Sequence, residues 1–312
     1  MMTDTSILRF RWSRFGLGLL VVALVFLGCD SEDLGDSEQV TPSIGDYVAE
    51  VQGFSTLNGV VQQVGLSGAL EADEERTLFA PLNSAFEPEI DPSLNPEVAE
   101  KVIQHHLVDG EQPSSSLSDG QSLTPLAGSD LVVEVDEGES AEDNVVTSVN
   151  RAAVTNADAN ASNGLVHVVD GLLADAVDRA TLTPQFSIFA RLVKEVDLED
   201  SLRTGSRTLF VPTNDALLEA FDDNGNGEIE SDELPSNAAD VLQYHVLDSV
   251  FLAADVPESE TAVTTLEGSD VTVVRDGDAV TLNPTDEEAS VTIPDVEVDN
   301  GVIHGIDTVL FP

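Results

Sequence analysis

Two kinds of residue are scarce in this sequence: cysteine and the basic residues. Cys29 is the only cysteine among 312 residues, so no disulfide can form within the chain and each folded part depends on its own hydrophobic core. Lysine and arginine together number 12 against 59 aspartates and glutamates, a formal net charge of −47. Such an acidic surface repels phosphate groups, which excludes nucleic acid and anionic lipid headgroups as expected partners.

The shortage of lysine, with Lys101 and Lys194 alone present, favours a saline environment. The hydrophobic fraction of 41% suits a folded protein, so the acidic residues belong on its surface. At about 1 M salt the Debye length is only about 3 Å, which screens the self-repulsion of such a surface. The composition is therefore typical of a halophilic protein. The alternative is an acidic, cation-binding surface protein from an ordinary habitat, and loss of the fold on dialysis to low salt would separate the two.

The N-terminus has the pattern of an export signal. Several arginines precede an apolar run from Phe15 to Leu27, which is too short to span a bilayer comfortably. The run ends at Phe26-Leu27-Gly28-Cys29, which resembles the lipobox of bacterial lipoproteins, where the signal is cut before a cysteine whose thiol carries a diacylglycerol. We therefore expect residues 1–28 to be a signal peptide and Cys29 to be the lipidation site. The alternative is an ordinary secretory signal, or an uncleaved anchor, with Cys29 incidental.

Residues 29–43 form an acidic, polar stretch almost without large apolar side chains, as expected of a solvated tether. Such a tether would hold the folded part clear of a lipid surface. The expected location is therefore outside the cytoplasm, as a membrane-anchored lipoprotein on the cell surface or in the periplasm.

The rest of the chain contains an internal repeat. Four blocks occur twice in the same order, which leaves little room for chance. The paired blocks are Thr77–Asn83 and Thr208–Asn214, Val102–Val108 and Val241–Leu247, Leu126–Asp130 and Leu266–Asp270, and Asn163–Asp170 and Asn300–Asp307. We therefore expect two tandem domains of the same fold, at residues 44–178 and 181–312.

Each copy begins with helical periodicity and ends with alternation. Phe54–Gln63 and Phe186–Glu195 space their apolar residues along one helix face, and Asn83 and Asn214 are placed to cap the helix that follows. Helices first and strands afterwards predict an α+β fold rather than a βαβ wind. The β-branched runs that follow Gly-Ser-Asp or Asn-Gly turns predict strands at Leu131–Val135, Leu165–Val169, Val271–Val274 and Val302–Ile306.

These blocks resemble the fasciclin domain. Its first signature is matched by TLFAPLNSAF at Thr77–Phe86 and TLFVPTNDAL at Thr208–Leu217, its central one by Tyr244–Val246, and its closing one by the Asn-Gly-x-Ile/Val-His strand. The resemblance covers residues 44–312 and implies two modules, each a wedge of β-sheets with a helical cap. It also implies adhesion or extracellular binding without catalysis.

The resemblance also suggests partner-binding residues. In animal adhesion members of the family the Tyr-His stretch is linked to receptor binding, so that role could carry over to Tyr244 and His245 of the second copy. The first copy departs from the family pattern with His105 in place of the tyrosine, and the second with Leu217 in place of a phenylalanine. The implied partner is an extracellular protein or polysaccharide.

An insertion distinguishes the second copy. Residues 222–233 read DDNGNGEIESDE, which matches the EF-hand calcium loop D-x-[DN]-x-[DN]-G-x5-E at every constrained position. Calcium takes about six to eight oxygen ligands. Gly227 permits the sharp turn, and Ile229 is the apolar residue expected to anchor the loop. The predicted ligands are the side chains of Asp222, Asn224, Asn226, Glu230 and Glu233 and the backbone carbonyl of Glu228.

The alternative to a calcium site is an acidic surface loop in a chain where acidic residues abound. That abundance does not explain the asparagines, glycine and isoleucine in register. The sequence has no second EF-hand, and only Asp222, Glu230 and Glu233 bring charge, so we expect a modest affinity suited to extracellular calcium. The first copy lacks such a loop, so calcium is expected to stiffen the second copy rather than to create its fold.

No sequence pattern points to catalysis. His106 and His167 of the first copy recur as His245 and His304, as expected of structural hydrogen-bonding residues. The sequence contains no H-E-x-x-H, no G-x-S-x-G and no phosphate-binding glycine motif. We therefore expect a surface binding protein that is not an enzyme. The first alternative is a calcium-dependent spacer or matrix component, and a remoter one is a surface hydrolase or enzyme accessory with a polar cleft around these histidines.

Overall fold

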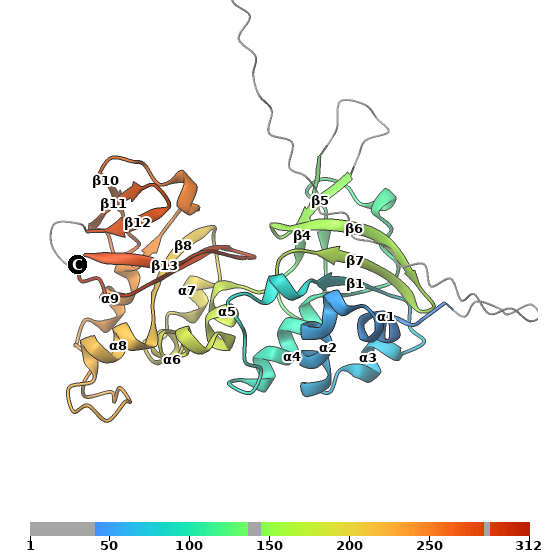
Figure 1. Ribbon diagram of the computed structural model, residues 1–312, viewed down its shortest axis with the longest axis horizontal. Helices are drawn as coiled ribbons and strands as arrows, with labels where there is room; N and C mark the ends of the chain where they lie inside the picture. The colour runs from blue at the N-terminus through green and yellow to red at the C-terminus, as the bar shows by residue number, and fades with distance from the viewer. Residues whose placement is uncertain (1–40, 137–144, 284–287) are drawn as a thin grey trace, which may run out of the picture. The chain divides into compact units, whose positions relative to one another are not determined.

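The computed structural model describes residues 41–136, 145–283 and 288–312, and Val40–Pro312 forms one compact unit (Figure 1). The predicted signal peptide, Cys29 and most of the predicted tether lie outside the described residues. In the described part of the chain, no helix combines the length and the apolar character needed to cross a membrane. The first helix starts at Ile44, because the Ser43 hydroxyl accepts a hydrogen bond from the Asp46 backbone N–H (3.1 Å).

The first repeat places its main helices ahead of most of its strands. Helix α4 starts with Pro96, whose missing N–H costs nothing there, and the Asn95 side chain caps it by accepting from the Val98 N–H. The helices are α1 (Ile44–Glu50), α2 (Ser55–Gln63), α3 (Ser67–Glu71) and α4 (Pro96–His105), with 3-10 turns η1 (Gln52–Phe54), η2 (Asn83–Phe86) and η3 (Ser114–Ser116). The strands are β1 (Arg76–Pro81), β2 (Leu107–Asp109), β3 (Ser122–Leu123), β4 (Leu131–Asp136), β5 (Val145–Val149), β6 (Ala152–Ala161) and β7 (Gly164–Val169).

The second repeat follows the same plan. Its helices are α5 (Ala176–Leu182), α6 (Ser187–Glu195), α7 (Glu199–Leu202), α8 (Asn214–Phe221) and α9 (Ala238–Tyr244), with 3-10 turns η4 (Pro184–Phe186) and η5 (Ala253–Asp255). Its strands are β8 (Arg207–Pro212), β9 (Val246–Leu247), β10 (Thr261–Thr264), β11 (Asp270–Asp276), β12 (Ala279–Leu282), β13 (Ala289–Val298) and β14 (Gly301–Ile306). The strands predicted from the alternating segments are present as β4, β7, β11 and β14.

Both repeats form the same seven-stranded mixed sheet within the described residues. The strand order is β2-β1-β7-β6-β5-β4-β3 in the first repeat and, read in the equivalent direction, β9-β8-β14-β13-β12-β11-β10 in the second. In each described sheet the first strand pairs in parallel with the last, Arg76–Pro81 with Gly164–Val169 and Arg207–Pro212 with Gly301–Ile306, and the other pairs are antiparallel. The α+β fold and the tandem repeat predicted from the sequence are confirmed.

The parallel pairs depend on a glycine at the start of each last strand. Gly164 has a φ of 142° and Gly301 a φ of 144°, a region that side chains rarely adopt. A Cβ atom on Gly164 would lie 1.8 Å from the Arg76 carbonyl oxygen, and one on Gly301 would lie 1.8 Å from the Arg207 carbonyl oxygen. The Asn-Gly turn therefore lets two backbones approach more closely than any side chain would permit.

The first sheet is buried on both faces at its centre. Helices α1 to α4 lie together on one side of it (Figure 1), and Leu78 of β1 packs into the core that they form. The next residue along the strand, Phe79, points to the opposite face and packs with Leu131 and Val149. This explains why the central strands are continuous apolar runs rather than strictly alternating ones.

Asn83 and Asn214, predicted to cap the helix that follows each of them, bind the start of an earlier helix instead. Asn83 lies in η2, and its side chain accepts a hydrogen bond from the Thr56 N–H (2.9 Å) at the start of α2. Asn214 does the same for the Ile188 N–H (3.0 Å) of α6, while Thr213 caps α8. The prediction of a local cap was wrong, because these amides satisfy the first turn of a helix that lies earlier in the sequence.

Helix α5 occupies the segment where the boundary between the domains was predicted, near residues 178–181. It is not a linker between two separate cores. Val177 packs into the core of the second repeat, and Leu182 packs into the core of the first. A single helix therefore contributes to both hydrophobic cores.

Candidate functional site

The predicted calcium loop, residues 222–233, connects α8 to α9, so a helix lies on either side of it as in an EF-hand. Ile229 is only 3% exposed and belongs to the core of the second repeat. The Arg191 guanidinium donates a hydrogen bond to the Ile229 carbonyl (3.2 Å). The loop is thus anchored at its apolar residue, while Asp223, Glu228 and Asp232, three of its six acidic residues, are exposed.

Asp222 organises the first half of the loop. Its two carboxylate oxygens accept hydrogen bonds from the backbone N–H groups of Gly225 (2.7 Å) and Gly227 (2.8 Å). Gly227 has a φ of 83°, which a residue with a side chain would adopt only with strain. The sharp turn predicted at this glycine is present, and it curls the backbone around the Asp222 carboxylate.

Glu233 closes the loop from its other end. Its carboxylate accepts hydrogen bonds from the Asn224 side-chain amide (2.8 Å) and from the Glu230 backbone N–H (2.9 Å). The Asn226 amide donates to the Glu230 carboxylate (2.6 Å), and its own side-chain oxygen accepts from the Glu228 N–H (2.7 Å). The oxygen-bearing side chains at loop positions three, five, nine and twelve therefore lie against one another.

Two carboxyl groups meet inside this cluster. A hydrogen bond between them lowers the pKa of Glu230 and raises the pKa of Glu233. Within the described residues, no group of three or more His, Cys, Asp or Glu side chains is arranged to hold a metal ion. Any cation in the loop would therefore depend on the oxygens of Asn224 and Asn226 as well as on carboxylates.

His106 and His245 are fully buried structural residues. The ring Nδ1 of His106 donates to the Val102 carbonyl (2.7 Å) and its Nε2 accepts from the Leu173 N–H (3.0 Å). His245 makes the equivalent bonds to the Val241 carbonyl (2.8 Å) and the Leu310 N–H (3.0 Å). Each neutral ring thus fastens the end of a helix to the segment that follows the last strand.

His167 and His304, the second pair of recurring histidines, also form hydrogen bonds to the backbone through both ring nitrogens. His167 accepts from the Asp158 N–H (3.2 Å), donates to the Gln112 carbonyl (2.9 Å) and stacks on Phe79. His304 makes the equivalent bonds to Asp295 (3.1 Å) and Phe251 (2.8 Å) and stacks on Phe210. Both ring nitrogens of all four recurring histidines are engaged with the backbone, which is the structural role inferred from their recurrence.

The proposed receptor-binding pair lies in the interior. Tyr244 is 4% exposed and its hydroxyl donates to the Asp270 carbonyl (2.9 Å), while His245 is completely buried. A partner at the surface of the described structure cannot touch either side chain. Partner binding at this position would require the end of α9 to move away from β11.

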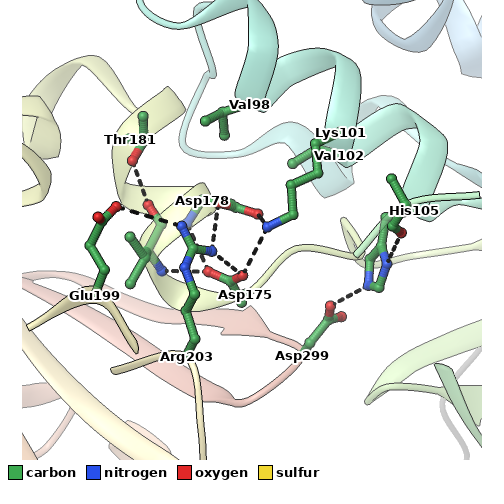
Figure 2. A network of polar contacts seen from close by, with 12 residues as sticks. Val98, Lys101, Val102, His105, Asp175, Asp178, Thr181, Glu199, Arg203 and Asp299 are labelled. Atoms are coloured by element: carbon green, nitrogen blue, oxygen red, sulfur yellow. Dashed lines mark hydrogen bonds and ion pairs between the residues drawn. The ribbon is translucent and has the colours of Figure 1, made fainter. Parts of the chain in front are cut away.

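A polar network lies where α4, α5 and the end of α7 meet (Figure 2). Asp175 and Asp178 lie between Lys101 on one side and Arg203 on the other, with Lys101 Nζ 2.6 Å and Arg203 Nη1 2.7 Å from the Asp178 carboxylate. Arg203 also hydrogen-bonds Asp175. The Asp178 side chain is only 3% exposed, and burial followed by the charge of Asp175 raises its pKa. Two cations neutralise two carboxylates at this junction.

Beside this network, His105 of the first repeat contacts Asp299 of the second, with Nε2 2.7 Å from Oδ2. These contacts were not predicted from the sequence. Acidic residues are so numerous that no spacing marks Asp175, Asp178 or Asp299, and the residues that meet are far apart in the chain. The scarcity of lysine was one available signal. In so acidic a chain, a lysine such as Lys101 is expected to make a specific contact with carboxylates.

The chain contains two copies of one mixed α+β module. The repeated blocks lie at the first strand, at the α4–β2 or α9–β9 junction and at the last strand of each copy. This arrangement defines a tandem-module protein of the fasciclin type. The model described as Fasciclin domain matches residues 52–175 and 184–312. The chain belongs to this family. Proteins of the family are typically adhesion or extracellular binding proteins and are generally not catalytic.

Relatives occur in animals and in bacteria. Human periostin is 26% identical over 279 residues, which cover 87% of this chain and 32% of periostin. Pig transforming growth factor-beta-induced protein ig-h3 is 28% identical and covers 83% of this chain and 36% of its own length. Protein sll1483 of Synechocystis sp. is 31% identical over 51% of this chain and 89% of its own length. The chain thus spans about a third of the length of these animal relatives.

Among solved structures, the chain resembles the one titled "Novel Fold Revealed by the Structure of a FAS1 Domain Pair from the Insect Cell Adhesion Molecule Fasciclin I". The sequence identity is 20% and the TM-score 0.40, over 83% of this chain and 97% of that one.

Proposed function

We propose that this chain is an exported, lipid-anchored adhesion protein without catalytic activity, whose two fasciclin modules bind an extracellular protein or polysaccharide. The observation that carries the proposal is the tandem fasciclin architecture itself. The recurring histidines, which an active site could have used, are committed to backbone hydrogen bonds instead. Cys29, as the only cysteine, is the single residue to which a thiol-linked lipid could attach.

Adhesion can be tested by coupling the mature chain to maleimide beads through Cys29, which reproduces the proposed anchor. We expect such beads to aggregate, or to be retained on surfaces coated with extracellular proteins or polysaccharides. Beads carrying an unrelated protein of similar negative charge are the control. Equal behaviour of both kinds of bead would contradict adhesion and favour a spacer. In a bacterial host, we expect the full chain to carry covalently bound lipid and its Cys29→Ala variant to carry none.

Calcium is proposed to bind the loop at residues 222–233 and to stabilise the second module. The support is the match of residues 222–233 to the EF-hand pattern at its five constrained positions, together with the contacts that Glu233 makes with Asn224 and Glu230, two of the other predicted ligands. The contact between the carboxyl groups of Glu230 and Glu233 also fits, because a divalent cation would offset the repulsion between them.

Isothermal titration calorimetry of calcium against the mature chain is expected to show one site, with a Kd of roughly 10⁻⁴ to 10⁻³ M. The double variant Asp222→Ala/Glu233→Ala is expected to lose the calcium heat, because it removes the first and the bidentate last ligand. Asp223→Ala/Asp232→Ala is the matched control, since it deletes two acidic residues of the same loop at positions that bind no metal. Equal heats in the parent and in the first double variant would end the calcium proposal.

A further inference from the structure

His105 stands at the end of α4, in the repeated block where the second copy has Tyr244. Its ring is buried, with 5% of the side chain exposed, and both nitrogens face oxygen atoms. Nδ1 lies 3.0 Å from the Ala127 carbonyl oxygen, and Nε2 lies 2.7 Å from Oδ2 of Asp299. The Asp299 side chain is equally buried, with 6% exposed.

The hydrogen-bond partners of His105 determine where its protons lie. A carbonyl oxygen only accepts hydrogen bonds, so the Nδ1 of His105 must carry a proton. A neutral ring with that proton on Nδ1 has a bare lone pair on Nε2, which would face the carboxylate of Asp299 at 2.7 Å. The contact is attractive only when a second proton lies between them, as an imidazolium paired with a carboxylate.

The position of the ring is fixed from several sides. Gly128 has a φ of 89°, and a Cβ on it would lie 2.4 Å from the His105 Nδ1, so only glycine leaves room for the ring. Asp299 lies in the turn between β13 and β14, and its backbone N–H donates to the Ala174 carbonyl (2.9 Å). The other carboxylate oxygen of Asp299, Oδ1, is buried without a hydrogen-bond partner. Asp299 therefore depends on His105 for neutralisation.

Other charged groups surround the pair. Lys101, on the same helix as His105, disfavours its protonation, but it is bound to Asp175 and Asp178 of the α5 segment. His106 stays neutral, because burial lowers its pKa to about 3. Burial by itself would also lower the pKa of His105, but the hydrogen bond and charge of Asp299 outweigh it and hold that pKa above its ordinary value of 6.5.

We propose that His105 and Asp299 form a proton-dependent contact between the two repeats, which is closed while the imidazole is protonated and is released when it loses its proton. Since the folded pKa is raised, the contribution of this contact is complete below pH 6.5 and is lost as the pH rises through the folded pKa. Above that point a buried lone pair and a buried carboxylate repel each other, and the junction loosens.

The mature chain is used for the test, with Cys29→Ser and one fluorophore-labelled cysteine in each repeat, at Gln62 in α2 and at Asp240 in α9. Single-molecule energy transfer is expected to give a narrow distribution at acid pH that broadens as the pH rises past 6.5. The resonance of His105 is expected to titrate over the same range. Constant far-ultraviolet circular dichroism would show that the repeats themselves stay folded.

Two variants separate this mechanism from a general effect of pH. In Asp299→Asn the amide can donate to the bare Nε2 of neutral His105, so the narrow distribution is expected to persist at all pH values tested. Asp276→Asn removes an exposed charge from the same repeat and is expected to behave as the parent. An unchanged midpoint in Asp299→Asn, or a His105 resonance that titrates below 6.5, would overturn the proposal.

Discussion

Replacing Gly301 with alanine is expected to unfold the second repeat. The new Cβ would lie 1.8 Å from the Arg207 carbonyl oxygen, which is a backbone atom of the paired strand β8 and cannot move aside as a flexible side chain could. The φ of 144° adds strain of its own. Relief of the clash requires separation of the parallel pair at the centre of the sheet. We expect a loss of more than about 4 kcal/mol in the free energy of unfolding, a magnitude reserved for disruptions of this kind.

Chemical denaturation followed by circular dichroism measures this loss. The equivalent change in the first repeat, Gly164→Ala, meets the Arg76 carbonyl oxygen at the same distance and is expected to cost a similar amount. Gly59→Ala is the control, because Gly59 lies in α2 with no atom within 4 Å of the added Cβ. It is expected to be neutral or to stabilise by up to about 1 kcal/mol. If Gly301→Ala unfolded at the denaturant concentration of the parent, the close approach of the two backbones would be disproved.

The second large effect is a loss of stability in mild acid that originates at His106 and His245. Both rings are fully buried and neutral, and burial lowers their pKa values to about 3 and about 4. Between pH 6.5 and these values the unfolded chain binds protons at these sites and the folded chain does not, so stability falls as the pH falls. At 1.36 kcal/mol per pKa unit, the contribution from His245 alone is on the order of 3 kcal/mol.

The acid effect is measured as the change in the free energy of unfolding between pH 6.5 and pH 4 in the parent and in His245→Gln. Glutamine can still accept the Leu310 N–H but has no proton to gain, so the variant is expected to be less stable near neutral pH and less sensitive to acid. The many carboxylates are common to both proteins, and the difference in slope therefore isolates the histidine. Identical slopes would mean that His245 is accessible to protons in the folded state.

Adjacent histidines thus respond to pH in opposite directions. Acid strengthens the contact that His105 makes with Asp299, while it weakens the core that His106 holds together. The difference arises from what each ring faces, since His105 meets a carboxylate and both ring nitrogens of His106 meet backbone groups. In mild acid, the chain is therefore expected to hold its repeats together firmly while each repeat loses stability.

Much of the fold was predictable because its signals are local. The Asn-Gly turns placed β7 and β14, and the Gly-Ser-Asp turns placed β4 and β11. The helical periodicity of Phe54–Gln63 and Phe186–Glu195 likewise placed α2 and α6. These signals work because turn chemistry and apolar periodicity act over a few neighbouring residues.

What escaped prediction depends on contacts between distant residues. Asn83 was expected to cap its own helix, yet its amide binds the start of α2, which only the folded arrangement brings near. Nothing in the sequence indicated that α5 would serve both cores or that Asp299 would meet His105. The predictions for calcium, for Cys29 and for the partner remain predictions, because each concerns a species bound to the chain rather than the chain alone.

The parallel pair at the centre of each sheet has a kinetic consequence. Arg76 pairs with Gly164 and Arg207 with Gly301, so the first strand of each module cannot form its parallel pair until the last strand is available. Contacts between residues so far apart in sequence slow folding, because the loop between them must be closed before the pair gains stability. A module still being synthesised or exported has no completed sheet, and folding is postponed until its last strand has emerged.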